Sequence, residues 1–442
     1  MNRELVRTYA AVLIVIVGLL TTNGWCQKID SINRDRAQVM LREISSDIKK
    51  HYYDPKFHGV NWDAQVEEAK QKINATDSMN RALSIVAAAL DSLNDSHTFF
   101  LPPAHANHYD YGWQAQVIGD RCFVIRVRPG SDAEKKGVKP GDELVALNGY
   151  TPNRDNLRKM EYVFNTLRPQ PGLRLDLRGP AGKQRQVEVV TTMIEKKKVT
   201  DLTGGGGGND IWDLIRQEES AEHLGRARFV ELGDDVGILR FPGFFFNESE
   251  IDSMIGKARK HKTLVLDLRG NPGGSVDTLK YLIAGCFEKE IKIGDRIGRS
   301  EQKPMVAKLH GHPFTGKLVV LVDSKSASAA ELFARVVQIE KRGTVLGDRS
   351  SGSVMEAKRY SYESGMDTVV FYGASITDAD LIMTDGLSLE RNGVLPDELV
   401  LPSAEDLAKG RDPVLAHAVE TVGAKLAPEA AGKLFPYEWP KF

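Results

Sequence analysis

The chain has 442 residues, of which 41% are hydrophobic and 27% are charged, and its formal net charge at pH 7 is -1. This length exceeds what one hydrophobic core supports and predicts about three structural units. A nearly neutral chain has no electrostatic reason to bind nucleic acid or an acidic membrane surface, so neither is expected as a partner. The composition does not exclude an oligomer.

Residues 1–26 have the pattern of a secretory signal peptide. Arg3 and Arg7 precede an apolar run from Ala10 to Leu20, and small polar residues follow that run. The run is shorter than the ~20 residues that a membrane-spanning helix needs. We therefore expect secretion to the periplasm or the cell exterior, and an uncleaved membrane anchor is the alternative.

The cysteines argue against a metal centre. Cys122 and Cys286 lie well beyond the signal segment, and apolar residues surround each of them. Such surroundings are typical of buried free thiols, and two cysteines are too few for a cysteine-based zinc site. No metal ion or cofactor is expected.

Residues 27–104 are predicted to form an N-terminal helical region. Apolar residues recur near helical spacing in the stretches 36–51, 62–73 and 79–93. The region ends at Pro102 and Pro103, and the pair Ser96–His97 stands shortly before them. A histidine after a helix is usually structural, so this pattern alone leaves the role of His97 open.

Residues 105–195 are predicted to be a small β-rich domain, because Gly, Pro and Asn break up short alternating runs. These runs are 114–118, 122–127, 143–147, 174–177 and 186–190. Residues 196–225 contain consecutive glycines from Gly204 to Gly208 and are predicted to be a flexible linker. No Lys-Ser or Lys-Thr pair follows these glycines, which excludes a phosphate-binding loop.

Residues 226–402 alternate between apolar strands and amphipathic helices, which predicts an α/β core with mainly parallel strands. A C-terminal helix and tail follow in residues 403–442. Within the core, the strand 318–322 leads through a Ser/Ala-rich turn into a helix. A helix N-terminus favours developing negative charge, so Ser326 and Ser328 are both candidates for a nucleophile. The alternative is that they only cap the helix.

A glycine turn ends another buried strand of the core. The segment Leu266–Gly274 reads LDLRGNPGG. Glycines at a strand-to-helix junction let backbone N–H groups approach an anion closely. A tight turn without a further role is the alternative.

The segment Val127–Gly149, VRPGSDAEKKGVKPGDELVALNG, resembles the PDZ family closely. Its Pro-Gly-Ser start, Gly-Val step, Pro-Gly-Asp turn and Asn-Gly end all stand where that family has them. The resemblance implies that residues 105–195 are a PDZ domain, which binds an extended peptide at a sheet edge and captures its C-terminal carboxylate. The family's carboxylate loop corresponds to Tyr111, Gly112 and Trp113, which are therefore expected to bind substrate.

The strings LRGNPGG and SASAAE, which end at Gly274 and Glu331, resemble the tail-specific, or C-terminal processing, serine peptidases of the S41 type. The order of helical region, PDZ domain and α/β core also matches that family over most of the mature chain. The resemblance implies a ClpP/crotonase-like protease core with Ser328 as the nucleophile. It further implies that the amides of Gly273, beside Gly274, and of Ala329 bind the oxyanion.

The general base distinguishes two branches of this family. The better-known branch pairs the serine with a lysine, but Ser353 stands at the corresponding position in this chain. A serine cannot act as the base, and the neighbouring lysines, Lys325 and Lys358, are out of register. A Ser-Lys dyad is therefore disfavoured.

The second branch, which resembles the tricorn core protease and the retinoid-binding-protein-like modules, uses a histidine in an L-x-x-S-H string and a glutamate before G-V-x-P-D. The strings LNDSH and LERNGVLPD of this chain match both. The resemblance implies that His97 is the base and that Ser96 and Glu390 orient it, with Ser96 bridging towards Glu390. Asp385 and Asp397 are rival carboxylates. Activity is expected to follow a base that titrates near neutrality.

Together these features predict a secreted or periplasmic serine endopeptidase that cleaves extended or unfolded polypeptides with assistance from the PDZ domain. Phe244 and Phe245 are expected to line its substrate groove or to pack in the core. Two alternatives are a non-catalytic binder of apolar ligands or peptides on the same fold, and a Ser-Lys peptidase that uses Lys358. A binder has no reason to keep the serine, histidine, glutamate and glycine turn together, which favours the enzyme.

Overall fold

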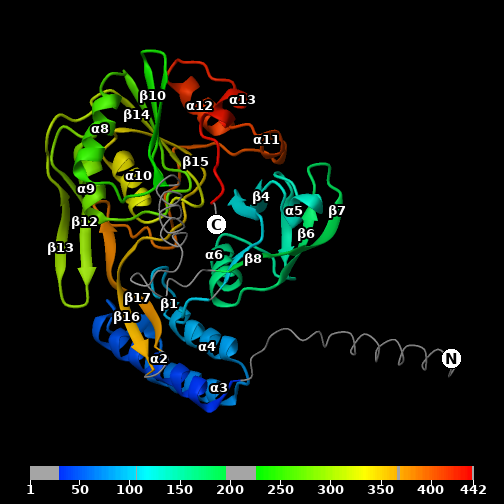
Figure 1. Cartoon of the computed structure of the whole chain (residues 1–442). Coiled ribbons are helices and arrows are strands. Elements are labelled where there is room, and N and C mark those ends of the chain that lie inside the picture. The colour runs from blue at the N-terminus through cyan, green and yellow to red at the C-terminus, as the bar shows by residue number, and fades with distance from the viewer. Residues whose placement is uncertain (1–28, 106, 196–224, 366–368, 441–442) are drawn as a thin grey trace, which may run out of the picture.

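The computed structural model describes residues 29–105, 107–195, 225–365 and 369–440 (Figure 1). The predicted signal segment 1–26 and nearly all of the predicted linker 196–225 lie outside the described residues. The chain is a mixed α/β protein with a helical region, a β-rich module and an α/β core. No helix in the described ranges is both long enough and apolar enough to cross a membrane.

Helices begin the described chain and pack against a sheet of the core (Figure 1). They are α2 (Ser31–His51), the short 3-10 turn η1 (Phe57–Gly59), α3 (Trp62–Ala75) and α4 (Met79–Asp91). On α2 the side chains of Met40, Ile44 and Ile48 are fully buried, because residues four apart share one face of a helix. After α4 the chain turns through Ser96 and His97 into the short strand β1 (Phe99–Leu101).

Residues 107–195 form a β-rich module. Its antiparallel sheet has the order β3-β4-β5-β6-β7, and β2 pairs with β8 beside it. The strands are β2 (Asn107–Asp110), β3 (Trp113–Ile118), β4 (Arg121–Val127), β5 (Glu143–Leu147), β6 (Gly172–Arg178), β7 (Gln184–Val190) and β8 (Thr192–Glu195). The helical elements are α5 (Asp132–Lys135), α6 (Leu157–Tyr162) and η2 (Val163–Leu167). Because β3 stands at the edge of the sheet, one side of it has no strand partner among the described residues.

The α/β core is built on a sheet in the order β18-β15-β14-β11-β10-β9. Its neighbouring strands are parallel, except that β9 and β10 are antiparallel. The strands are β9 (Arg228–Leu232), β10 (Val236–Arg240), β11 (Thr263–Asp267), β14 (Lys317–Val322), β15 (Gly343–Gly347) and β18 (Glu398–Leu399). Parallel strands end at the same edge of a sheet, so the turns after β10, β11, β14 and β15 lie side by side.

Helices cover both faces of this sheet (Figure 1). Leu318, Val320 and Val322 of β14 belong to the core that includes α8 (Glu248–Ala258), α9 (Val276–Ala284) and α10 (Ala329–Ile339). Val319 and Leu321 pack on the other face, against α12 (Pro413–Thr421) and α13 (Pro428–Leu434). Burial on both faces explains the continuous apolar run in the sequence. The predicted C-terminal helix is α12, and α11 (Ala404–Lys409) and α13 accompany it.

A second, antiparallel sheet was not predicted. It contains β12 (Ile291–Gly298), β13 (Gln302–Ala307), β16 (Met355–Ser364) and β17 (Val370–Met383), together with β1. The strand β16 alternates polar and half-buried residues, so it lacks the apolar run that marked the parallel strands. Phe99 of β1 lies opposite Ser375 of β17, and this pairing attaches the end of the helical region to the core.

Candidate active site

Ser328 stands at the N-terminus of α10, directly after the turn that follows β14. Its backbone has φ 54° and ψ -119°, a conformation that is strained for a residue with a side chain and that often occurs at functional sites. Ser326, the other candidate, is fully buried. Its Oγ donates a hydrogen bond to the carbonyl oxygen of Leu268 (2.8 Å) and accepts one from the amide of Asp323 (2.9 Å). Ser326 therefore fixes the turn, and Ser328 is the partly exposed serine.

Glu331 holds the backbone of Ser328 in place. Its fully buried carboxylate accepts hydrogen bonds from the amides of Ser328 (3.0 Å), Gly352 (2.7 Å) and Ser353 (2.9 Å), and from Ser350 Oγ (2.6 Å). Burial raises the pKa of Glu331 to about 7, although these four hydrogen bonds act to lower it. The sequence pattern assigned no role to Glu331, although the SASAAE string contains it.

On the base side, His97, Ser96 and Glu390 form a chain of hydrogen bonds. His97 Nδ1 lies 2.7 Å from Ser96 Oγ, and Ser96 Oγ donates to Glu390 Oε2 (2.8 Å). The amide of Ser96 donates to Glu390 Oε1 (2.8 Å). Because the single hydroxyl proton of Ser96 goes to the carboxylate, Nδ1 of His97 carries a proton and donates it to Ser96. This leaves the Nε2 of His97 unprotonated and able to accept a proton.

Asp95, which the sequence patterns did not single out, shapes the turn that presents His97. Its Oδ1 accepts hydrogen bonds from the amides of His97 (2.9 Å) and Thr98 (2.7 Å) and from Thr377 Oγ1 (2.7 Å). Its Oδ2 accepts a hydrogen bond from the hydroxyl of Tyr52 (2.9 Å). The turn is therefore fixed to both the helical region and β17.

The environment of His97 keeps its imidazole neutral. Burial and the nearby positive charge of Arg158 lower the pKa of His97 to about 4, against the opposing effect of Asp95. Arg158 lies on α6 of the β-rich module, and its Nη1 donates a hydrogen bond to Ser353 Oγ (3.0 Å). This pKa corrects the expectation of a base that titrates near neutrality, because neither the burial nor Arg158 could be read from the motif.

Residues 350–354, here called the linking loop, join the two sides of the site. The amides of Gly352 and Ser353 donate to Glu331, while the next amide, that of Val354, donates to Glu390 Oε2 (2.9 Å). The carbonyl oxygen of Ser353 accepts a hydrogen bond from the amide of Ser328 (2.8 Å). The linking loop thus holds the serine side and the histidine side on one short piece of backbone.

The glycine turn after β11 lies directly against Ser328. A Cβ atom on Gly273, whose φ is +92°, would stand 2.6 Å from the Cβ of Ser328, so only glycine fits there. The amide of Gly273 already donates to Asn271 Oδ1 (2.8 Å), which corrects its assignment as a free oxyanion donor. The amides of Gly274 and Ala329 have no hydrogen-bond acceptor among the described residues. These two amides remain available to an oxyanion.

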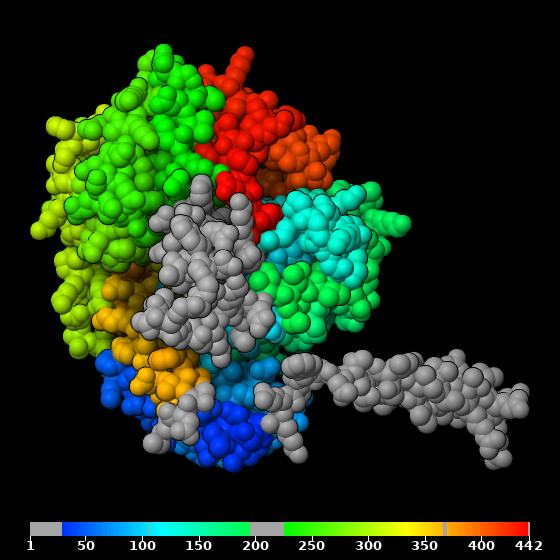
Figure 2. All heavy atoms as spheres, viewed as in Figure 1, coloured from blue at the N-terminus to red at the C-terminus, as the bar shows by residue number. Residues whose placement is uncertain are grey.

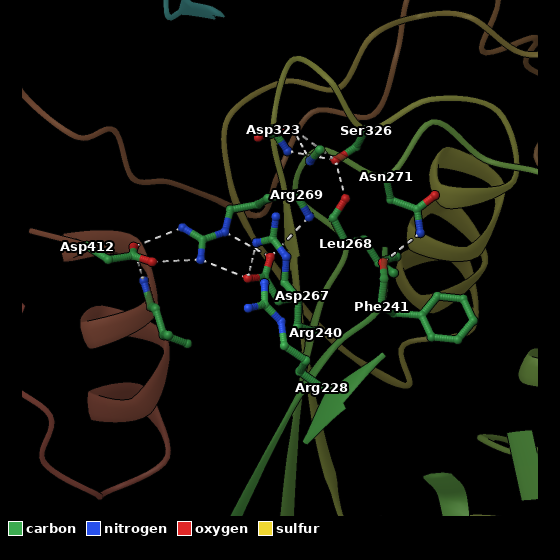
Figure 3. A network of polar contacts seen from close by, with 12 residues as sticks. Arg228, Arg240, Phe241, Asp267, Leu268, Arg269, Asn271, Asp323, Ser326 and Asp412 are labelled. Carbon is green, nitrogen blue, oxygen red and sulfur yellow. Dashed lines mark hydrogen bonds and ion pairs between the residues drawn. The ribbon is translucent and has the colours of Figure 1, made fainter. Parts of the chain in front are cut away.

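A buried ion-pair network supports this turn (Figure 3). Asp267 at the end of β11 is fully buried and pairs with Arg240 (2.7 Å) and Arg269 (2.9 Å). Burial alone would raise the pKa of Asp267, but the two arginines hold it well below its usual range. Arg269 also makes a two-pronged contact with Asp412 at the start of α12 (2.9 and 2.8 Å). The network therefore ties the glycine turn to the C-terminal helices.

The residues predicted to bind substrate have different locations. Tyr111 and Trp113 line a cavity of about 550 Å³ between the β-rich module and the core, with Gly112 between them. Phe244 is fully buried and packs against Phe241, with ring centroids 5.1 Å apart, so it does not line a groove. Phe245 is 57% exposed. Of its two expected locations, Phe244 therefore occupies the core, which corrects its assignment as a substrate-binding residue.

The rival groups have other partners. Lys358 is 64% exposed and forms an ion pair with Asp378 (2.8 Å). The hydrogen bond to Asp378 raises the pKa of Lys358, whereas a lysine that acts as a base needs a lowered pKa. Lys325 faces Glu161 at 3.6 Å.

The rival carboxylates are also engaged elsewhere. Asp385 pairs with Arg335, and Asp397 accepts a hydrogen bond from the amide of Val345 (2.8 Å). Among the described residues, no group of three or more His, Cys, Asp and Glu side chains is arranged to hold a metal ion.

Comparison with known proteins gives two family matches. Residues 235–400 match the peptidase family S41, and residues 34–80 match the C1 domain of tricorn protease. A carboxyl-terminal-processing protease of Picosynechococcus sp. is 24% identical over 381 residues, which cover 82% of this chain and 83% of the relative. The carboxy-terminal processing protease CtpA of Bacillus subtilis is 23% identical over 366 residues, covering 79% of this chain and 71% of the relative. The crystal structure of mature CPAF shares the fold, with a TM-score of 0.64 at 16% identity over 90% of this chain and all of the other.

Proposed function

The chain carries a peptidase family S41 domain and is a peptidase, and from this premise we propose that it is a secreted or periplasmic serine endopeptidase that cleaves extended or unfolded polypeptides. Ser328 is the nucleophile and His97 the base. One observation supports this most strongly: the linking loop binds both Glu331, which holds the amide of Ser328, and Glu390, which anchors the Ser96–His97 pair. No cofactor takes part.

Each side chain has a defined task in the proposed mechanism. Nε2 of His97 removes the proton of the Ser328 hydroxyl as Oγ attacks the peptide carbonyl, and later returns that proton to the leaving amine. Ser96 and Glu390 keep the proton on Nδ1 and stabilise the imidazolium that forms. The free amides of Gly274 and Ala329 bind the developing oxyanion, a contribution of ~3 kcal/mol per donor. The low pKa of His97 ensures that its imidazole starts the reaction neutral.

The β-rich module is proposed to act as a PDZ domain. Its edge strand β3 offers backbone groups to an extended peptide. Trp113, the first residue of β3, and Tyr111, which precedes the strand, line the adjoining cavity. A substrate C-terminus bound there would lead its upstream residues towards the core. Secretion rests on the charged and apolar pattern of residues 1–26.

The other two candidate functions are weaker. A binder of apolar ligands would need the phenylalanines after β10 to open onto a pocket, but Phe244 is fully buried. A Ser-Lys peptidase would need Lys358 to be deprotonated, but its ion pair with Asp378 raises its pKa. Neither of the two accounts for the hydrogen-bonded chain from His97 to Glu390.

A fluorophosphonate probe for serine hydrolases tests the proposal directly. The purified mature protein is compared by intact mass with Ser328→Ala, His97→Ala and Lys358→Ala. We expect labelling of the wild type and of Lys358→Ala, and its loss in the other two variants. Labelling that survives in His97→Ala but not in Lys358→Ala would overturn the histidine mechanism. No labelling of the wild type would count against an activated serine.

A further inference from the structure

The cavity between the β-rich module and the core is rich in positive charge. It has a volume of about 550 Å³ and is lined by five arginines: Arg126, Arg226, Arg228, Arg240 and Arg269. It is here called the arginine cavity. Arg126 comes from β4 of the module and the other four come from the core, so the two parts of the chain build it together.

Ion pairs neutralise two of these arginines. Arg240 and Arg269 pair with Asp267, and Arg269 also with Asp412. By contrast, no described carboxylate lies within ion-pairing distance of the remaining arginines, which are Arg126, Arg226 and Arg228.

Positive charges outnumber negative ones in the lining of the cavity, which also contains Lys325, Glu161, Asp323 and Glu438. Burial lowers the pKa of Arg126, and the charges of Arg240 and Arg269 act in the same direction, against the opposing effects of Tyr437 and Asp323. Burial and Arg240 also lower the pKa of Arg228, against the opposing charges of Glu438 and Asp267. An anionic ligand would relieve this repulsion in a partly desolvated site.

A segment of the chain itself lies on these arginines. In Figure 2 the last described residues, in red, reach down between the core and the module. The guanidinium of Arg126 lies 4.1 Å from the ring centroid of Tyr437, and Gln114 Nε2 donates to the Tyr437 hydroxyl (2.7 Å). Arg228 donates to the carbonyl oxygen of Pro436 (2.8 Å). The cavity thus already holds an extended peptide through its backbone and an aromatic ring.

The same segment brings an acidic side chain into the cavity. Glu438 lines it beside Tyr437, and its charge raises the pKa of Arg228. The guanidinium of Arg128 lies 4.8 Å from the ring centroid of Trp439, and its Nη1 donates to the carbonyl oxygen of Pro440 (3.3 Å). Residues 436–440 are here called the C-terminal segment. They place backbone carbonyl groups and the carboxylate of Glu438 against the arginines of the cavity.

The arginine cavity continues towards the nucleophile. A second cavity of about 270 Å³ shares Glu161, Gly270 and Lys325 with it. This second cavity is also lined by Pro272 and Ala327, the residues immediately before Gly273 and Ser328. A peptide seated on the arginines can thus extend along the second cavity to the serine.

We propose that the arginine cavity binds an acidic stretch of the polypeptide substrate and that the C-terminal segment competes with it for the same arginines. This inference rests on the proposed peptidase function. Asp and Glu side chains of the substrate pair with Arg126, Arg226 and Arg228, which form no ion pair with a described carboxylate. The cavity therefore selects substrates by charge at a distance from the scissile bond, and substrate entry displaces Glu438 and Tyr437.

Binding is measured first, without turnover. Full-length mature protein with Ser328→Ala is titrated against fluorescent peptides of equal length that carry a pair of Glu residues, or Gln at the same positions. We expect the Glu peptide to bind about tenfold more tightly, with a preference that shrinks as salt is raised. Equal affinity for the two peptides would overturn the proposal.

Variants of single arginines test whether the preference for the Glu peptide arises in the arginine cavity. Arg126→Gln and Arg226→Gln, each combined with Ser328→Ala, should weaken binding of the Glu peptide by about threefold to tenfold and leave the Gln peptide unaffected. Arg226 is exposed, so its variant tests the site without a risk to folding. Arg174→Gln, an exposed arginine on β6 of the same module, is the matched control and should bind as the parent does. A loss of the same size in Arg174→Gln would contradict a local site.

The competitor role has its own variant. Tyr437→Ala with Trp439→Ala should raise the affinity for the Glu peptide severalfold, with Phe371→Ala, a 69% exposed aromatic on β17, as the control. Weaker binding of both peptides, together with a lower melting temperature, would show that the segment is a structural brace and would overturn its role as a competitor. Cleavage of both peptides by the wild type is measured separately. If the Glu peptide binds more tightly but neither peptide is hydrolysed, the result contradicts the peptidase function and supports the binding site.

Discussion

The serine side and the histidine side of the site are built over very different lengths of chain. Ser328 and Glu331 stand three residues apart at the start of one helix, so the order of residues in a single turn sets their contact. Ser96 and Glu390 are 294 residues apart and meet only when the helical region docks on the core. The serine side is thus a product of local structure, and the histidine side is a product of tertiary assembly.

The largest expected effect comes from Glu331→Gln, which disrupts the serine side of the site. A glutamine amide offers one acceptor oxygen in place of two and turns its NH₂ towards backbone donors. Kcat/KM should fall on the order of 10³ and the free energy of unfolding by about 3 kcal/mol, because buried donors lose their partner. Hydrolysis of a quenched peptide and thermal unfolding measure the two effects. The exposed Glu420→Gln on α12 is the control, and wild-type activity in Glu331→Gln would contradict the role assigned to Glu331.

The histidine side of the site is tested with Ser96→Ala, Glu390→Gln and the double variant. Each single change should lower kcat by about 10², because His97 loses the partner that holds its proton on Nδ1. Since the three groups act as one chain, the double variant should be no slower than the worse single variant. Additive losses would show that Ser96 and Glu390 act independently of one another.

A smaller effect is expected from Arg158→Met, which removes a charge that belongs to the module and acts on the base. Arg158 lowers the pKa of His97, so without it that pKa should rise from about 4 towards the ordinary histidine value. A higher pKa protonates more of the base in mild acid, so the acid limb of the kcat profile should move to higher pH, while activity at pH 8 changes little. Arg174→Met, on the same module, should leave the limb in place. If the acid limb of Arg158→Met stays where it is in the wild type, the charge of Arg158 does not affect the pKa of His97.

The smallest effect is expected from Lys358→Met. This lysine is largely exposed and pairs with Asp378, and exposed ion pairs contribute about 0–1 kcal/mol. Peptide hydrolysis should change less than about twofold. A loss comparable to that of His97→Ala would restore the lysine as the base.

Much of the fold could be predicted because its elements carry strong local patterns. Strands buried on both faces, such as β14, appear as continuous apolar runs, and α2 repeats its apolar residues at helical spacing. The sheet that contains β16 and β17 could not be predicted in this way, because β16 alternates polar and half-buried side chains. Its pairing with β1 joins Phe99 to Ser375, and no local pattern specifies a contact over that separation.

The site also contains residues that short sequence strings identify and residues that only the tertiary structure reveals. Short strings pointed to Ser328, His97, Ser96 and Glu390, and the structure brings the last three into one hydrogen-bonded chain. Arg158 escaped notice because it lies on a short helix without a motif and acts only through its tertiary position. The amide of Gly273 was assigned wrongly because the side chain of Asn271 folds back to accept its proton, which the letters NPGG do not reveal.

The long separation between Ser96 and Glu390 has a consequence for the synthesis of the protein. A ribosome makes His97 early, Ser328 much later, and Glu390 later still. A nascent chain, or a product that stops before residue 390, therefore carries Ser328 and His97 without the carboxylate that holds Ser96 beside His97. Glu390 is thus the last member of the hydrogen-bonded chain to be synthesised, and we expect a product truncated before it to lack an ordered His97.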